Sequence, residues 1–479
     1  MRTRLETPTS VCRAAVTRAD ITPPVGFYHR MWGAATHEQA TGVHRPLLAT
    51  VLAIGPHDDS TSPVLIVAID HCLLFTKESA AFRHEICQRT GIDPDHLLLT
   101  FSHTHAAGLL DPSRADRPGG EMIAPYLTDL AETVSTLIDQ ARASLQDATL
   151  TYGVGHCALA AHRDARDETS QQWVCGLNLD GPVDSTVLVA RIDDHRQQPI
   201  ASIVNYGCHP TTLAWANTLI SPDYPGAMRE TVEAATGAPC LFLLGACGDV
   251  GPRVGYVGDV AVADRNGTQL GHAALEAWYG LSPSATDYVY RGPVVSGATL
   301  GEWRHTTAEP ARAARWSLFG LKRFAVPLPY RADKPQLDQL RAERGVCEVR
   351  KQAALDRGDT EAARDQHAIM ERLSRAITRW EACPSGDTFP FQVALLRMGE
   401  AVWVFVESEP YQWLQTELRR RFPDWTIMVV VLLDGWRCAY LPRDEMYGSG
   451  VYPDQISMVA RGGLEAVVDA IADEIAALS

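Results

Sequence analysis

The sequence predicts an α/β protein, built as a layered mixed β-sheet that is flanked by helices. Short apolar runs alternate with amphipathic stretches through the first half of the chain, and this alternation favours a layered α/β fold. Hydrophobic residues make up 46% and charged residues 21% of the 479 residues, which are ordinary proportions for a globular protein. The length suits one large domain or two of average size.

Hydrophobic periodicity locates the individual elements. A predicted strand is a short apolar run bounded by turn-forming or small polar residues, and a predicted helix repeats apolar residues every three to four positions. We predict strands at 64–69, 97–101, 149–156, 186–192, 200–206, 240–244 and 402–406, and helices at 78–91 and 124–145. The run at 240–244 continues into glycines, which is typical of a tight turn.

Residues 334–381 have a different composition. They are rich in Arg, Gln, Glu and Ala, with apolar residues at helical spacing and an interruption at Gly358-Asp359. This pattern predicts an antiparallel pair of helices, inserted into the domain as a helical hairpin. Three roles stay open for the insertion: it shapes access to the substrate, it forms the contact of a homo-oligomer, or it is a plain solvated hairpin.

Charge and cysteine content restrict the partners and the compartment. The formal net charge of -15 argues against nucleic acid and against anionic membranes, because both need clustered Lys and Arg. The first residues lack the apolar core of a signal peptide, and no apolar run is long enough for a transmembrane segment. The 11 cysteines include no C-x-x-C pair and make a poor disulfide framework. We therefore expect a cytoplasmic protein with a small-molecule substrate.

Three of the predicted strands end in side chains that can bind a metal. They are His103 and His105 after 97–101, His209 after 200–206, and Glu407 and Glu409 after 402–406. Neutral imidazole is the commonest protein metal ligand, and functional groups of α/β proteins gather where strands end. Each side chain taken alone is better explained as a polar strand end, but three strands that end alike predict a shared metal site at one sheet edge.

Several motifs together resemble one known family. They are ADITPP at 19–24, GVH at 42–44, SHTH at 102–105, HPT at 209–211 and GDV at 248–250. In this order and spacing, from about residue 12 to about 475, the chain is similar to the neutral/alkaline non-lysosomal ceramidases. The resemblance implies a single catalytic domain over 1–479, without the immunoglobulin-like C-terminal domain of longer members. It also implies a zinc amidase that hydrolyses an N-acyl amide bond by metal-activated water.

The resemblance also implies a role for individual residues. The zinc ligands would be His103, His209, Glu409 and Tyr440, and the catalytic side chains would be His105, Arg163 and Tyr452. Two imidazoles, one carboxylate and a weakly bound phenol leave zinc an open position for water, as catalytic zinc sites require. Arg163 and Tyr452 would then stabilise the oxyanion, and His105 would accept or deliver a proton.

The chain departs from the family pattern near the implied site. Gly251 stands where ceramidases carry a serine, and the turn after His105 is the less polar Ala106-Ala107-Gly108. These departures indicate a substrate other than ceramide, namely an N-acyl compound for which a lipid-like acyl chain is one option. Two alternatives stay open at this point: an esterase or lactonase that uses the same metal site, and a non-catalytic protein that keeps the ceramidase fold.

Overall fold

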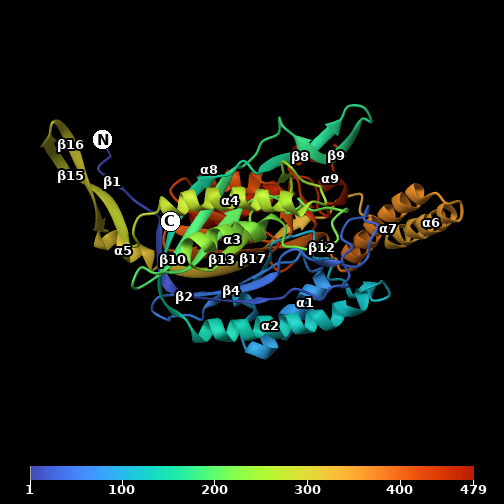
Figure 1. The fold of residues 1–479 in the computed structure, drawn as a ribbon, viewed down its shortest axis with the longest axis horizontal. Coiled ribbons are helices and arrows are strands. Elements are labelled where there is room, and N and C mark those ends of the chain that lie inside the picture. Colours follow the sequence, from blue (N-terminus) through green and yellow to red (C-terminus); the bar gives the residue numbers. More distant parts are fainter. Residues whose placement is uncertain (1, 479) are drawn as a thin grey trace.

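Two β-sheets pack face to face in the computed structural model, which describes residues 2–478, and helices cover the outer face of each sheet (Figure 1). The large sheet contains β2 (Thr9–Asp20), β4 (Leu48–Gly55), β5 (Val64–Ile69), β6 (Leu97–Phe101), β7 (Gln146–His156), β10 (Thr186–Asp194), β11 (Pro199–Tyr206) and β13 (Cys240–Leu244). The small sheet contains β17 (Phe319–Pro329), β18 (Thr388–Met398), β19 (Ala401–Val406) and β21 (Thr426–Val430). This arrangement confirms the predicted layered α/β fold.

Both sheets are mixed, as predicted. The order in the large sheet is β13-β11-β10-β7-β2-β4-β5-β6, with parallel pairs only at its two ends, and the order in the small sheet is β17-β18-β19-β21. Helices α2 (Ile123–Ala143), α3 (Tyr224–Thr236) and α4 (Val260–Tyr279) pack on the large sheet, and α1 (Thr76–Thr90) packs on α2. Helices α8 (Trp413–Arg421) and α10 (Gly463–Ala476) pack on the small sheet.

Alternate residues of the strands build the core between the sheets. Leu52 and Leu243 of the large sheet share one apolar cluster with Trp403 and Phe405 of β19, and all four are buried. Because side chains alternate across a strand, the intervening residues face the covering helices instead. The tight packing of Trp403 and Phe405 fixes the position of β19, and therefore of the acidic residues that follow it.

The large sheet curls until its two edge strands, β6 and β13, lie beside one another. The segment that follows β21 joins them, since Val431 N–H donates to Leu244 O of β13 (2.9 Å) and Asp434 N–H donates to Leu99 O of β6 (2.9 Å). The expectation of one shared sheet edge is therefore wrong in one respect. The strands before His103 and His209 belong to the large sheet, whereas Glu409 follows a strand of the small sheet.

Two hairpins project from opposite ends of the molecule (Figure 1). At one end are α6 (Leu337–Asp356) and α7 (Thr360–Glu381), and at the other are β15 (Thr286–Ser296) and β16 (Ala298–Thr307), with β1 (Arg4–Leu5) and α5 (Pro310–Trp316) nearby. The first pair confirms the predicted helical hairpin. Among residues 2–478, none of the helices combines the length and the apolar character needed to cross a bilayer.

Short elements near the C-terminal ends of β6, β11 and β19 complete the fold. They are β3 (Gly42–Val43), β12 (Leu219–Ile220), β8 (Ala160–Asp167), β9 (Gln172–Asn178), β14 (Val250–Pro252), β20 (Glu409–Pro410), β22 (Tyr440–Leu441), α9 (Tyr452–Ile456), and the 3-10 turns η2 (Pro112–Arg114), η3 (Gly120–Met122) and η4 (Asp444–Met446). A further 3-10 turn, η1 (Pro94–His96), leads into the N-terminal end of β6. Strands β14, β8 and β9 form a separate three-stranded sheet, and β20 pairs with β22.

Candidate metal centre

The backbone takes an unusual conformation in three of the segments that deliver the candidate ligands. His103 has φ 66°, Ser408 before Glu409 has φ 69°, and Ala439 before Tyr440 has φ 65°. Left-handed backbone is uncommon for residues other than glycine, and such strain concentrates at functional sites because only the surrounding structure can hold it. The turns therefore aim these side chains at a common point at the expense of local backbone energy.

The rings of His103 and His209 are each oriented by a hydrogen bond from Nδ1 to a backbone carbonyl. Nδ1 of His103 lies 2.8 Å from the carbonyl oxygen of Cys72, and Nδ1 of His209 lies 2.6 Å from that of Cys247. A carbonyl oxygen can only accept, so Nδ1–H is the donor in each pair and Nε2 of the neutral ring carries a lone pair. This is the arrangement in which metal-binding histidines are oriented by an outer partner.

Glu409 faces both of these Nε2 atoms. Its Oε2 lies 2.8 Å from Nε2 of His209 and 3.4 Å from Nε2 of His103, and the three side chains are at most 2% exposed. Burial and the nearby Arg163 lower the pKa of His209 to about 4. Burial opposes ionisation of Glu409, yet a proton on His103 or His209 holds the pKa of this carboxyl well below its ordinary value, so without a cation the site would bind a proton instead.

The donor set fits a cation. With Nδ1–H bonded to carbonyls, two imidazole lone pairs and a carboxylate converge in a buried site, and all their ligand atoms lie within 4.8 Å of one another. Buried acceptors that face one another are costly unless a proton or a cation lies between them. A metal with nitrogen and oxygen ligands satisfies all three.

Tyr440 stands beside Glu409 because β20 and β22 pair in parallel, with these two residues in register. The phenol oxygen lies 3.3 Å from Nε2 of His209, so it is on the same side of the imidazole as the carboxylate. Burial raises the pKa of Tyr440 well above its ordinary value. The structure thus brings together all four side chains that the sequence singled out as metal ligands.

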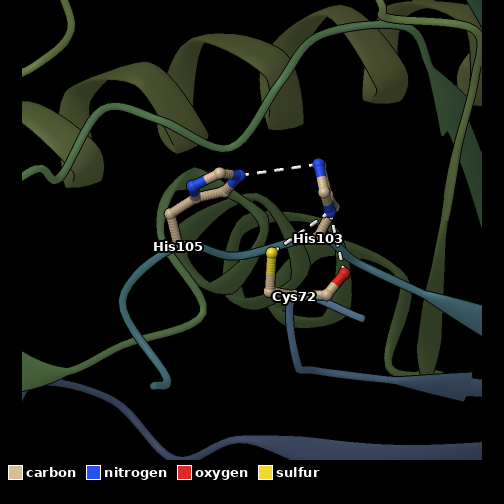
Figure 2. Close-up of side chains that lie close together, drawn as sticks. All are labelled: Cys72, His103 and His105. Carbon is tan, nitrogen blue, oxygen red and sulfur yellow. Dashed lines mark hydrogen bonds between the residues drawn. The ribbon is translucent and has the colours of Figure 1, made fainter. Parts of the chain in front are cut away.

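A second group, formed by Cys72, His103 and His105, is also close enough to hold an ion. Figure 2 shows that it straddles the ring of His103: Cys72 lies at Nδ1, with Sγ at 3.4 Å, and His105 Nε2 lies 3.5 Å from Nε2. Since Nδ1 of His103 already donates to the Cys72 carbonyl, only Nε2 of this ring has a lone pair for a metal. Cys72 lies on the Nδ1 side of the ring and His105 on the Nε2 side, so one ion bound at Nε2 would not reach both. His103, His209 and Glu409 are therefore the better donor set.

A cavity of about 290 Å³ opens beside the centre, and the three predicted catalytic residues line it together with Tyr440. Burial, reinforced by His103 and His209, lowers the pKa of His105 well below its ordinary value. The guanidinium of Arg163 lies over the Tyr440 ring at 5.3 Å and donates to Gly248 O at 2.8 Å. Tyr452 is 38% exposed and packs edge-on against Tyr440, at the rim of the cavity.

Sequence reasoning missed several side chains of this cavity. Trp32 packs on His105 with ring centroids 5.1 Å apart, and Arg372, Arg375 and Arg379 of α7 line the wall. No local pattern marks Trp32. The arginines carry a signal, because their spacings of three and four residues place them on one face of a predicted helix. The insertion therefore shapes the cavity of its own chain.

Two glycines near the centre differ in how much room they leave for a side chain, so we expect their substitution to affect stability differently. A Cβ at Gly251 would meet only Thr211 Oγ1 at 3.6 Å, whereas a Cβ at Gly248 would lie 2.6 Å from the backbone oxygen of Glu409. We expect Gly251→Ser to change the free energy of unfolding by less than about 0.5 kcal/mol, and Gly248→Ala to lower it by about 1–3 kcal/mol through overpacking. Urea unfolding of both variants checks this, and equal losses would contradict it.

Known structures share this fold, although sequence comparison finds no relative. No family model matches the chain, and no curated protein matches it. A structure described as a ceramidase complexed with C2 superposes with a TM-score of 0.64 at 16% identity, covering 99% of this chain and 75% of the other. The neutral ceramidase from Pseudomonas aeruginosa gives a TM-score of 0.62 at 15% identity, with the same coverage. The chain therefore has the fold of the neutral ceramidases, as the motifs implied.

Proposed function

We propose that this protein is a zinc-dependent hydrolase that cleaves an N-acyl amide bond. The observation that carries the proposal is the convergence of two Nε2 lone pairs and a buried carboxylate beside a cavity. His103, His209 and Glu409 would hold the ion, with Tyr440 as a weaker fourth ligand. The histidine, carboxylate and phenol set suits zinc and leaves it an open position. The shared fold supports the choice of amide chemistry.

The side chains around the centre supply the rest of the reaction. When bound, zinc would polarise the acyl group and lower the pKa of water. Arg163 reaches the cavity with its Nε unpartnered, which suits a donor to the oxyanion that forms during acyl transfer. His105 lies close enough to the centre to take a proton from water and deliver it to the leaving nitrogen. Tyr452 would contact the substrate at the rim.

The test combines metal analysis with a matched pair of substrates. We expect about one zinc ion per chain in the purified protein, and hydrolysis of a short N-acyl amide that stops with chelator and resumes with added zinc. An ester of the same acyl group is the comparison. Faster hydrolysis of the amide than of the ester, corrected for the rates without enzyme, supports amidase chemistry. Activity that survives complete removal of metal would contradict the proposal.

Removal of the metal is also expected to destabilise the fold. The ligands are buried, so we expect the ion to bind only the native state. Such an ion adds about 2.7 kcal/mol to the free energy of unfolding when free zinc is a hundredfold above the dissociation constant. Thermal unfolding with and without chelator measures the loss. The control is calcium in place of zinc, which prefers six to eight oxygen ligands and should restore little stability. An unchanged unfolding temperature would argue that no metal binds there.

A further inference from the structure

One wall of the cavity is strongly cationic although the chain as a whole is acidic. Arg372, Arg375 and Arg379 of α7 line the cavity together with Arg163, whereas the formal net charge of the protein is -15. Glu371 is the carboxylate of the same lining, and it is engaged elsewhere, with its Oε2 2.8 Å from Nη1 of Arg114. Glu371 also lies near enough to Arg375 for their charges to interact, but four arginines against one carboxylate leave this wall with a net positive charge.

Arg379 is the least compensated of these side chains. It is 6% exposed, its guanidinium stacks on the Trp436 ring at 4.9 Å, and its Nε has no hydrogen-bond partner. Within residues 2–478 no carboxylate oxygen lies within ion-pair distance of Arg163, Arg375 or Arg379. Burial lowers the pKa of Arg379 to about 10. A buried cation without a counter-ion is costly, so the cavity is suited to bind an anion.

Arg375 is also positioned to bind an anion in the cavity. One of its terminal nitrogens donates to the carbonyl oxygen of Met31, and its Nε is buried without a partner. The side chains at 375 and 379 are one helical turn apart, so their guanidinium groups lie on the same face of α7. Planar guanidinium groups bind carboxylates through paired hydrogen bonds, which gives direction as well as charge.

We infer that the substrate carries a carboxylate, which Arg375 and Arg379 bind while the acyl group contacts Met31, Trp32 and Ile456 of the same cavity. This inference rests on the proposed function and names its substrate class, a carboxylate-bearing N-acyl amide. The carboxylate belongs either to the amine half, as in an N-acyl amino acid, or to the acyl half, as in a dicarboxylic acid monoamide. In both, water adds to the acyl carbon, the C–N bond breaks, and the nitrogen leaves as an amine with the proton.

Three probes of similar size test the inference: N-hexanoylglycine, N-butylsuccinamic acid and the uncharged N-hexanoylethanolamine. We measure kcat/KM with the zinc-loaded protein, and binding by calorimetry with the chelated protein, which does not turn over. A carboxylate bound by charge-assisted hydrogen bonds should favour one acid over the uncharged probe by about 10–100-fold in both measurements. The favoured acid identifies the half of the substrate that carries the charge.

Variants of α7 then assign the preference to the arginines. Arg379→Gln and Arg375→Gln should each reduce the preference for the acid at least severalfold, and Arg379→Lys should retain part of it because the charge remains. Arg364→Gln is the matched control, since Arg364 lies exposed on the same helix and hydrogen-bonds Asp365. Circular dichroism checks that each variant is folded.

The outcomes separate this inference from the proposed function. Equal binding of the acids and the uncharged probe, or a preference that survives both glutamine variants, would overturn the inference. Selective binding of an acid without hydrolysis of any probe would overturn the proposed hydrolase and leave the carboxylate site standing. Hydrolysis of the uncharged probe alone would support the hydrolase and reject the carboxylate.

Discussion

Replacement of His209 by alanine is expected to abolish metal binding and to reduce amide hydrolysis by on the order of 10³-fold or more, beyond the 10–100-fold typical of an outer-shell partner. The substitution removes one of the two imidazoles whose Nε2 faces the Glu409 carboxylate. His103 and Glu409 would remain beside the weakly bound phenol of Tyr440, and this set holds an ion poorly because only two of the three strong protein ligands of a catalytic zinc site are left. Elemental analysis beside an activity assay measures both effects.

The matched control for this variant is His156→Ala. His156 is exposed on β7, away from the cavity lining, so its loss should leave metal content and activity unchanged. Circular dichroism shows whether each variant keeps its fold. Undiminished hydrolysis by a folded, metal-free His209→Ala protein would refute the metal-dependent mechanism.

The strands that lead to the centre were predictable because their signal is local. An apolar run with small polar residues after it describes β6 completely, and its predicted bounds, 97–101, are those of the structure. The helix predicted at 124–145 is found as α2, Ile123–Ala143. Burial of every residue in a short strand leaves a continuous apolar run that needs no tertiary information to recognise. His103 and Glu409 stood out because they are ionisable side chains that follow shortly after such an apolar run.

What the sequence could not supply depends on long-range packing. No local pattern indicates that β19 belongs to a second sheet, or that the curled large sheet brings β6 and β13 together. The carbonyls of Cys72 and Cys247, which fix the imidazoles, have no sequence signature at all. The strands β9, β15 and β16 were not predicted either, since exposed hairpins lack the apolar run of a buried strand. Strand β8 was missed for another reason: it is mostly buried, but His162, Arg163 and Asp164 interrupt its apolar run. Tyr440 entered only through the family resemblance.

Arg229→Met is expected to lower the free energy of unfolding by about 3–5 kcal/mol, which is the usual loss when one partner of a buried ion pair is removed. Arg229 of α3 reaches Asp70 at the end of β5 with both terminal nitrogens, one of them at 3.1 Å, and both side chains are at most 6% exposed. Methionine fills similar space but leaves the carboxylate buried without its cation. Urea unfolding monitored by tryptophan fluorescence measures the change.

The double variant Asp70→Asn/Arg229→Met separates the lost charge partner from lost packing. Asparagine keeps an oxygen for the Leu48 N–H, which donates to Asp70 at 3.0 Å, and removes the unpaired charge. Most of the lost stability should therefore return, since exchanging both members of a buried pair costs far less than removing one. Metal content should fall in Arg229→Met but not in the double variant. The unpaired Asp70 would disturb the segment up to Cys72, two residues further on, whose carbonyl orients His103. A single variant as stable as the double would show that the ion pair contributes little.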